Sequence, residues 1–575
     1  MPNYLDYLYR FEVSSLKGYL GENLVDTLIE WMPEGNTLLT RQRLIKMIDS
    51  LHGTNILKNK NFRKDLLLSM GEDDILEIRD ACLSGKEKKE EDPAKLADVI
   101  SGKAWGKNNL SLHLSEKWNV DKSIFDKESL HDMEVVNQVE AGERFYELLD
   151  YQYYIKQRIL YILNSGQELE RLLVHMPTGT GKTKTTMHTV VNYIEFTLQK
   201  QGLILWVAHT TELLQQAYDT FVDVWSHLGD GEITAYKIWG KNTLEGTTEP
   251  LNGIAFCGLS KLMSIEENNP SLMRRLEMDC RLIVFDEAHK AAATETRRVI
   301  ECLMRKKEGM ENRALIGLSA TPGRTTEASF DNRLLSHMFG DKLIDINVDI
   351  LNQINMGSLK ALNTIAEKNI IRYFQQRRIL SKLVVEKLTY QKEFTKEELD
   401  LLEADLRILG YEDFTEKQLK VLAANKQRNF SIMVKLRELF NAKKPTIVFA
   451  CSVEHAKLIS AMLTLEEIPN SLVVGEMNPI DRKKAIDEFK DRQSNVNIII
   501  NYEVLTTGFD SKNIQCVFIT RPTKSVVLYS QMIGRGLRGP LMGGNEECLL
   551  IDIEDNIKSF DNENAFSHFN DYWKV

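Results

Sequence analysis

The chain has 575 residues, which at roughly 100–200 residues per domain predicts about three or four domains. Hydrophobic residues make up 43% and charged residues 27%, an ordinary balance for a globular protein that excludes a mainly disordered chain. The formal net charge of -10 excludes a histone-like coat of positive charge, but it leaves room for a local basic channel that binds nucleic acid.

Residues 1–135 are predicted to form a helical accessory domain, because apolar residues recur three and four positions apart in residues 15–32 and 73–83. The charged run at residues 86–95 is interpreted as a solvated linker or helix end rather than a binding patch. This domain is the candidate surface for a protein partner.

The first residues, MPNYLDYLYRFEVSSL, contain no basic stretch followed by an apolar core, which argues against a secretory signal. No apolar run approaches the ~18 residues of a membrane span. The seven cysteines include no C-x-x-C pair, so neither a zinc knuckle nor a disulfide framework is indicated. We therefore expect a cytoplasmic location and no membrane partner.

Two further regions alternate short apolar runs with helical stretches, which predicts buried parallel strands in α/β lobes. The first lobe is expected at 136–350 and the second at 441–575, with a mostly helical connector or insertion at 351–440. The predicted strands are 172–176, 203–208, 254–258, 282–285, 314–319, 446–450, 472–474, 497–501, 516–520 and 549–552. The predicted fold class is therefore α/β, with two parallel-sheet lobes, a helical N-terminal domain and a mostly helical connector.

The segment MPTGTGKT, which follows an apolar run and precedes a predicted helix, has the strand–loop–helix context of a phosphate loop. Its two glycines let the backbone N–H groups point at phosphate oxygens, and the helix N-terminus adds a positive dipole end. The lysine can reach the β/γ-phosphates, and the last threonine can ligate Mg²⁺. The candidate nucleotide ligands in this loop are Thr178, Gly179, Thr180, Gly181, Lys182 and Thr183.

A second motif, Asp286-Glu287-Ala288-His289, follows the apolar run at 282–285. This places two acids at the carboxyl edge of the predicted sheet, where ligands bind in open α/β folds. Asp286 suits a Mg²⁺ contact, and Glu287 is the candidate that orients and deprotonates the attacking water. His289 is a candidate for sensing the γ-phosphate or for coupling to the next motif.

Together these motifs resemble those of the DEAH-type superfamily 2 helicases, close to the branch with type I restriction motor subunits and related DNA-repair helicases. Met176 stands where a strict Walker A motif has glycine, and the Pro-Thr-Gly-x-Gly-Lys-Thr form is typical of this group. The resemblance covers about 140–560. It implies two RecA-like lobes of the P-loop NTPase type that share one site for ATP and Mg²⁺, and nucleic acid as the partner.

In the first lobe, Gln152 resembles the glutamine that contacts adenine in this branch, although the neighbouring tyrosines also fit simple packing on a helix. His209, Thr210 and Thr211 resemble motif Ia and suit phosphate contacts, whereas residues 212–216 are expected to cap and pack the helix. Further candidates are Ser260 for a phosphate contact, and Ser319 and Thr321, ahead of Pro322, for coupling the two binding sites.

In the second lobe, residues 447–456 resemble motif IV, and residues 452–456 are expected to begin a helix beside bound nucleic acid. The stretch 505–510 resembles motif V: Thr506 and Thr507 suit phosphates, and Asp510 suits the ribose or a relay between the sites. Gln531, Arg535 and Arg538 fit motif VI, and their spacing of three places both arginines on one helical face. A planar guanidinium neutralises the charge of a transferring γ-phosphoryl group, so the arginines are candidate catalytic residues beside Lys182 and Glu287.

The favoured function is that of an ATP hydrolase, a DNA helicase or translocase driven by closure of the two lobes. Two alternatives stay open: an RNA helicase or remodeller, and an ATP-gated sensor that recruits an effector through residues 1–135, for example in defence against foreign DNA. The basic stretch at 370–382 is interpreted either as a solvated helix face or as a surface that tracks a nucleic-acid backbone. Its candidates are Arg372, Arg377, Arg378 and Lys382.

Overall fold

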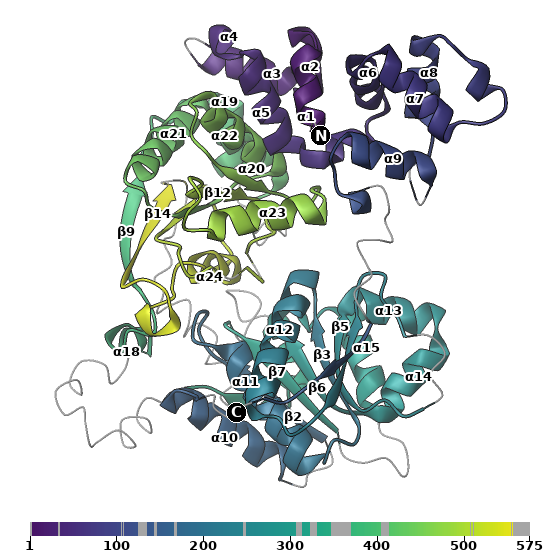
Figure 1. Cartoon of the computed structure of the whole chain (residues 1–575). Helices are drawn as coiled ribbons and strands as arrows, with labels where there is room; N and C mark the ends of the chain where they lie inside the picture. The colour runs from purple at the N-terminus through teal and green to yellow at the C-terminus, as the bar shows by residue number, and fades with distance from the viewer. Residues whose placement is uncertain are drawn as a thin grey trace.

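The computed structural model has three parts, a helical N-terminal domain and two α/β lobes (Figure 1). It describes residues 3–555 except 33–34, 105, 107, 125–134, 143–146, 166–168, 245–248, 306–312, 322–329, 347–369, 404–412, 507, 510 and 554. Within this described part, every helix is too short or too polar to span a bilayer.

The N-terminal domain is helical, as predicted, and polar side chains fix where its helices begin. Thr40, Asn59, Asp92 and Asn108 each accept a hydrogen bond from a backbone N–H in the first turn of the helix that follows. The charged run at 86–95 ends at such a cap, because Pro93 is the first residue of α8. The helices are α1 (Tyr4–Tyr7), α2 (Val13–Leu20), α3 (Glu22–Trp31), α4 (Gly35–Leu38), α5 (Arg41–His52), α6 (Lys60–Met70), α7 (Glu72–Cys82), α8 (Pro93–Gly102) and α9 (Asn109–Lys117), with the 3₁₀ turn η2 (Gly53–Lys58) after α5.

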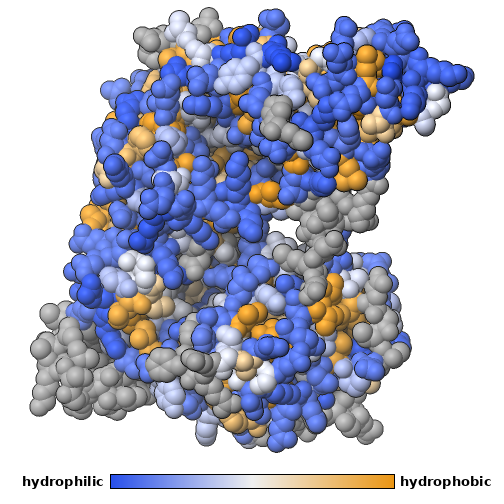
Figure 2. All heavy atoms as spheres, viewed as in Figure 1, coloured by the Kyte–Doolittle hydropathy of each residue, from blue (hydrophilic) through white to orange (hydrophobic). Residues whose placement is uncertain are grey.

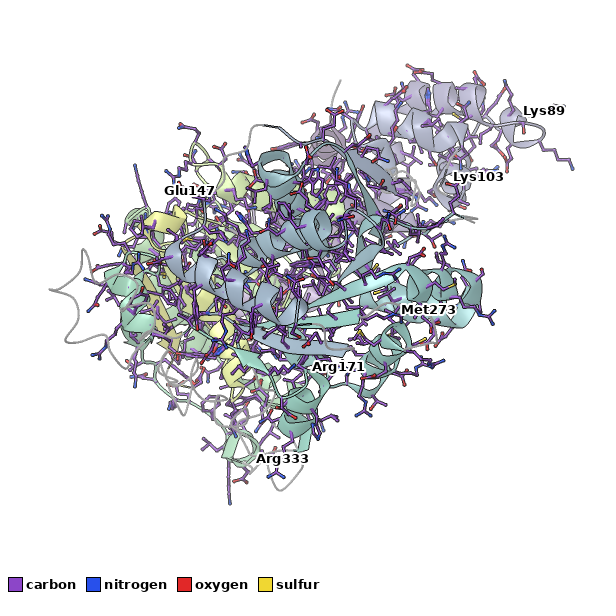
Figure 3. The ribbon with its side chains drawn as sticks, turned by 90° about the horizontal axis from the view of Figure 1, so that it is seen from below. Lys89, Lys103, Glu147, Arg171, Met273 and Arg333 are labelled. Carbon is purple, nitrogen blue, oxygen red and sulfur yellow. The ribbon has the colours of Figure 1, made fainter. Side chains whose placement is uncertain are left out.

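This domain packs directly on the second lobe, and one hydrophobic core runs through both. Helix α5 lies against α22 (Val453–Leu465), where the hydroxyls of Ser50 and Ser460 are 3.0 Å apart. The helices α6 to α9 extend away from the lobes. Lys89 and Lys103 mark this projecting part in the view from below (Figure 3).

Lobe 1 is built on an eight-stranded sheet with the order β1-β4-β5-β3-β6-β7-β2-β8. All neighbouring strands are parallel except β1 and β4. Successive residues of β3 enter two different cores, which shows that helices cover both faces. The strands are β1 (Val136–Val139), β2 (Leu169–His175), β3 (Leu203–Ala208), β4 (Ile233–Ile238), β5 (Gly253–Gly258), β6 (Cys280–Asp286), β7 (Arg313–Ser319) and β8 (Leu343–Ile344), and the helices are α10 (Asp150–Leu163), α11 (Lys182–Asn192), α12 (Thr211–Leu228), α13 (Leu259–Asn268), α14 (Pro270–Asp279), α15 (Thr294–Met304) and α16 (Phe330–Met338).

Lobe 2 is built on a six-stranded parallel sheet with the order β11-β12-β10-β13-β14-β9. One face packs against α21, α22 and the N-terminal domain, and the other packs against α23 and α24 in a core that continues into lobe 1. The strands are β9 (Lys382–Leu388), β10 (Thr446–Phe449), β11 (Ser471–Val473), β12 (Ile498–Asn501), β13 (Cys516–Ile519) and β14 (Glu547–Ile553), and the helices are α18 (Ile370–Gln376), α19 (Lys396–Glu403), α20 (Glu416–Ala424), α21 (Lys426–Asn441), α22, α23 (Pro479–Lys490) and α24 (Val526–Gly534).

The segment expected to be a mostly helical connector contributes one strand to the second sheet. Helices α18 to α21 agree with the expectation, but β9 pairs in parallel with the whole length of β14. As an edge strand, β9 leaves Val384 and Val385 exposed, and none of its residues is buried.

A buried ion pair stabilises the second lobe. Arg428 is fully buried in α21, and its guanidinium donates 2.6 Å to a carboxylate oxygen of Asp555. Replacing Arg428 with Met leaves this carboxylate buried without its counter-charge, so we expect a loss of about 3–5 kcal/mol in the free energy of unfolding. Thermal unfolding monitored by calorimetry measures the effect. The exposed Arg437, which pairs with Glu466, is the control: Arg437→Gln is expected to leave the unfolding midpoint nearly unchanged.

Candidate active site between the two lobes

Three neighbouring strands of lobe 1 end side by side and bring three predicted motifs together. His175 at the end of β2 is level with Ser319 at the end of β7, and Leu318 is level with Asp286 at the end of β6. The phosphate loop, the Ser319–Thr321 turn and the acidic motif therefore lie along one edge of the sheet. Ligands bind at this carboxyl edge in open α/β folds.

The phosphate loop has the backbone geometry that its glycines predict. Gly179 and Gly181 have φ angles of 86° and 82°, in the region that side chains disfavour. A Cβ on Gly181 would lie 2.5 Å from the side-chain nitrogen of Gln152. Helix α11 begins at Lys182. The backbone N–H groups of its first turn and the lysine side chain therefore lie together and form a cradle for an anion.

The loop threonines divide into two groups. The buried Thr180 hydroxyl donates to the Pro177 carbonyl at 2.7 Å and so holds the loop itself rather than standing free for a ligand. Thr178 and Thr183 are half-buried. The side chain of Thr178 packs against lobe 2, because a Cβ on Gly534 would lie 2.5 Å from its methyl carbon.

Lys182 lies between the two acids of the second motif. Its Nζ is 3.6 Å from Asp286 Oδ1 and 3.7 Å from Glu287 Oε1. Glu287 has a φ of 54°, a strained conformation for this residue, and its other carboxylate oxygen is 3.3 Å from His289 Nδ1. The cluster is almost completely buried, so its charges interact strongly.

The two carboxyl groups have opposite pKa shifts. Burial raises the pKa of Asp286, and the Lys182 charge only partly offsets this rise. Burial also acts to raise the pKa of Glu287, but Lys182, His289 and Arg535 together lower it well below its ordinary value. Glu287 therefore stays ionised, as a proton acceptor must.

Gln152 contacts the phosphate loop, whereas its neighbour Tyr151 is packed in the core. Its side-chain nitrogen donates to the Thr180 carbonyl at 3.0 Å, and its oxygen accepts from the Leu149 N–H at 3.0 Å. Tyr151 is buried, and its hydroxyl donates to the same Thr180 carbonyl at 2.6 Å. Tyr153 is 56% exposed, so packing on the helix does not account for all the tyrosines.

The arginines of lobe 2 reach the cleft by a route different from the predicted one. Helix α24 ends at Gly534 with Arg535 as its C-cap, so the expectation that Arg535 and Arg538 share one helical face is wrong. Arg535 donates to the Phe509 carbonyl at 2.5 Å, and its charge acts on Glu287 across the cleft. Arg538 lies over the phosphate loop, where its Cγ is 3.8 Å from the position of a Cβ on Gly179.

The chain turns after α24, where Gly534 and Gly536 flank Arg535. The following segment, at Arg538, is held by Leu380 and Ser381. The Ser381 hydroxyl, just before β9, lies 2.5 Å from the Arg538 carbonyl oxygen and 2.7 Å from the Asn545 carbonyl oxygen, which share its one proton. Gln531 is buried; its carbonyl accepts from Arg535 Nε at 3.3 Å, and its Nε2 has no hydrogen-bond partner among the described residues.

The candidates for nucleic-acid contact and coupling differ in how free their polar groups are. The hydroxyls of Thr210, Thr506 and Ser319 make local hydrogen bonds: Thr210 caps α12, Thr506 donates to the Glu503 carbonyl, and Ser319 donates to the Thr321 carbonyl at 2.5 Å. Thr211 and Ser260 are exposed at the starts of α12 and α13. Thr507, Asp510 and Pro322 lie outside the described residues.

His209 is packed edge-on against Phe285, with ring centroids 5.5 Å apart. Burial, with the nearby Lys290 and His289, lowers the pKa of His209 from 6.5 to about 4. Folding therefore favours the neutral ring, and this stability is complete above about pH 6.5 and is lost as the pH falls toward about 4.

We expect His209→Gln to flatten the fall of the unfolding midpoint between about pH 6.5 and pH 4. Scanning calorimetry of both proteins across this range measures the difference. Identical slopes for wild type and variant would show that His209 titrates alike in the folded and unfolded chains. Other buried histidines, such as His175, contribute equally to both curves.

The basic stretch at 370–382 is neither a free helix face nor a backbone-tracking surface along its whole length. Arg377 forms an ion pair with Asp150, the first residue of α10, and donates a hydrogen bond to the Tyr373 hydroxyl at 2.7 Å. Arg378 pairs with Glu546 at 2.5 Å. Arg372 and Lys382 are exposed. Helix α18 thus joins the segment that carries Gln152 to the loop that carries the arginines.

The cradle and its charged residues fit ATP, and they fit Mg²⁺ only as a partner of the nucleotide. No group of three His, Cys, Asp or Glu side chains among the described residues can hold a metal ion by itself. Thr183 and Asp286 would supply a hydroxyl and one carboxylate, which matches a Mg²⁺ ion that also takes phosphate oxygens.

Comparison with known proteins finds one family match in each lobe. Residues 145–324 match the family described as "Type III restriction enzyme, res subunit", and residues 430–539 match the "Helicase conserved C-terminal domain". A protein of Schizosaccharomyces pombe named as a mitochondrial ATP-dependent helicase, irc3, is 25% identical over 68% of this chain and 54% of its own length. The Escherichia coli "Type I restriction enzyme EcoAI endonuclease subunit" is 23% identical over 72% of this chain and 47% of its own.

Among solved structures, a fragment of an HsdR subunit of a type I restriction enzyme from Vibrio vulnificus covers 78% of this chain and 70% of that one. The identity is 19% and the TM-score 0.47. The chain spans about half the length of the curated relatives it matches. The motifs, the matches to both lobes and these relatives confirm the resemblance to the superfamily 2 helicases and to the branch that includes the type I restriction motor subunits.

Proposed function

We propose that this protein is a nucleic-acid-dependent ATPase, a DNA helicase or translocase that couples ATP hydrolysis in the cleft between its lobes to movement on DNA. One observation carries the proposal: Lys182, Asp286 and Glu287 of lobe 1 form a buried cluster whose electrostatics already include Arg535 of lobe 2. A site assembled from both lobes makes hydrolysis depend on lobe closure, and closure is how nucleotide state becomes motion.

In the reaction, the phosphate loop binds the phosphates of ATP. Lys182 moves from the carboxylates of Asp286 and Glu287 to the phosphate oxygens. Water attacks the γ-phosphorus, the bond to the bridging oxygen of ADP breaks, and Glu287 accepts the proton of the water. Arg535 neutralises charge on the equatorial oxygens, with Arg538 beside the loop. Mg²⁺, held through Thr183 and Asp286, would supply further neutralisation of the phosphate charge. Gln152 lies at the loop and is the candidate for adenine contact.

DNA is the proposed substrate because restriction enzymes act on DNA, and one matching family and one matching relative carry that name. The core motifs themselves grip phosphate backbones and discriminate poorly between DNA and RNA. His209, Thr210, Thr211, Ser260, Thr506 and Thr507 remain the proposed backbone contacts, and Ser319, Thr321, His289 and Gln531 the proposed coupling residues. An RNA helicase is therefore the second candidate.

The third candidate, an ATP-gated sensor in defence against foreign DNA, is favoured by one structural feature. The N-terminal domain shares a core with lobe 2, so a protein partner bound to it would move with that lobe when the cleft closes. We place the protein in the cytoplasm, while one relative is named as mitochondrial.

The test is an ATPase assay of the full chain with single-stranded DNA, duplex DNA and RNA, joined to displacement of streptavidin from end-labelled strands. Stimulation by DNA with displacement supports the motor. Stimulation by RNA alone moves the assignment to the RNA helicases. Stimulation without displacement by any of the three nucleic acids favours the sensor. No stimulation by any of them contradicts a nucleic-acid-dependent ATPase.

A further inference from the structure

The two lobes make a further charged contact, remote in sequence from Arg535 and Arg538. Arg482 in the first turns of α23 donates 2.7 Å to a carboxylate oxygen of Glu212 in the first turn of α12. A second guanidinium nitrogen donates to the Gly475 carbonyl at 3.1 Å, which holds the arginine in place. In Figure 1, α12 rises at the top of lobe 1 and α23 lies above it in lobe 2.

The backbones are close at this contact as well. Gly508 has a φ of 68°, and a Cβ on it would lie 3.1 Å from both Glu212 Cβ and the Leu213 nitrogen. The side chains of Arg482 and Glu212 are 19% and 32% exposed, and the Nε of Arg482 is buried without a hydrogen-bond partner among the described residues. A guanidinium held in this way depends on Glu212 for its counter-charge.

Glu212 also lies beside the residues that are candidates for holding a nucleic-acid phosphate. It follows Thr210, the cap of α12, and the exposed Thr211. A carboxylate next to a bound phosphate is unfavourable unless a cation neutralises it. When the lobes close, Arg482 supplies that cation, so phosphate binding at the start of α12 and closure of the cleft favour each other.

The residue before Arg482 fixes the N-terminal domain. The Asp481 carboxylate accepts hydrogen bonds from the Thr54 N–H at 2.8 Å and from the Thr54 hydroxyl at 2.6 Å. Asn55 donates to the Glu476 carbonyl at 2.6 Å in the same region. Two adjacent residues of α23 therefore hold two different bodies, Asp481 the N-terminal domain and Arg482 lobe 1.

We propose that Glu212 and Arg482 are positioning residues that couple nucleic-acid binding to ATP hydrolysis, and that the N-terminal domain sets the position of this pair through Asp481. The inference rests on the proposed function. The pair adds a charged contact between the lobes to those that Arg535 and Arg377 make, and it is the one that lies beside the start of α12.

The two single variants are expected to differ in a way that a purely structural role does not produce. Glu212→Gln and Arg482→Gln should each reduce the turnover number stimulated by single-stranded DNA about 5-fold, with the KM for ATP nearly unchanged. Arg482→Gln leaves the carboxylate un-neutralised beside the phosphate, so it should also raise the KM for DNA. Glu212→Gln removes the carboxylate, so it should not.

The exchange variant Glu212→Arg with Arg482→Glu restores the pair in the opposite sense and is expected to recover most of the turnover number. Arg437→Gln, which removes a 2.6 Å ion pair inside lobe 2, is the matched control and should behave as wild type. Single variants within about twofold of wild type, or an exchange variant as slow as the singles, would overturn the positioning role.

The N-terminal link is tested by a double-mutant cycle of Asp481→Asn and Arg482→Gln. If the domain acts through α23, the double variant should be no slower than Arg482→Gln alone. Independent, multiplying losses would contradict the link. If the wild-type chain shows no DNA-stimulated hydrolysis, the proposed function fails. The contact is then tested by small-angle X-ray scattering with a non-hydrolysable ATP analogue bound. A larger radius of gyration for Glu212→Gln than for the wild type supports the positioning role, and an equal radius contradicts it.

Discussion

Glu287→Gln is expected to reduce the ATP turnover number by about 10²–10⁴ while ATP still binds. The amide occupies the same space but accepts no proton from the attacking water. Lys182, 3.7 Å from the carboxylate, keeps its place beside Asp286 and the phosphate loop, so the cradle for the nucleotide survives. Stimulated ATPase rates measure the loss, and titration with a fluorescent ATP analogue measures binding.

Nucleotide affinity should rise slightly in this variant rather than fall. The wild-type site holds two carboxylates near the phosphates, and the variant removes one negative charge from a buried cluster. Glu295→Gln is the control, because this exposed glutamate lies in the same lobe at the start of α15. A Glu287→Gln protein that turns over ATP at the rate of the control would remove Glu287 from the role of proton acceptor.

The strands of both lobes could be predicted where they are buried on both faces. β3 and β5 read as continuous apolar runs because helices cover each side of the sheet. The strands β1, β4, β8 and β9 were not predicted. β1 and β8 are short edge strands, and β9 is an edge strand with no buried residue. β4 is mostly buried, but Thr234 and Lys237 interrupt its apolar residues.

The ATP site could be predicted as far as its residues lie in continuous motifs. The phosphate loop and Asp286-Glu287 need only one strand and one turn each, and the order of β2, β7 and β6 brings them together. The prediction that Arg535 and Arg538 share one helical face failed because it extended a helix past Gly534, where the structure ends it.

Contacts between distant segments carried no signal in the sequence. Glu212 was expected to cap or pack its own helix, and it pairs with Arg482, 270 positions away in the chain. Arg377 was weighed as a solvent-facing or nucleic-acid-tracking residue, and it pairs with Asp150. Both arginines sit among other basic residues, and nothing in the local pattern distinguishes a paired guanidinium from a solvated one.

Arg535→Ala is expected to reduce the turnover number by about 10³–10⁵, with a much smaller effect on ATP affinity. The guanidinium acts on charge that develops in the transition state. In the structure it donates to the Phe509 and Gln531 carbonyls and acts through space on Glu287. Single-turnover hydrolysis with saturating nucleic acid measures the chemical step directly. Arg535→Lys keeps the charge but not the planar fork, so it should fall between wild type and Arg535→Ala.

The same experiment on Arg538→Ala separates the two arginines. Arg538 lies over Gly179 of the phosphate loop, so its loss should affect ATP affinity as well as turnover, while Arg535 should affect turnover alone. If both alanine variants hydrolyse ATP at the wild-type rate, the two lobes do not share one site. Loss of turnover in Arg535→Ala with intact binding instead ties hydrolysis to closure, because only a closed cleft brings a lobe 2 guanidinium to a phosphate held by lobe 1.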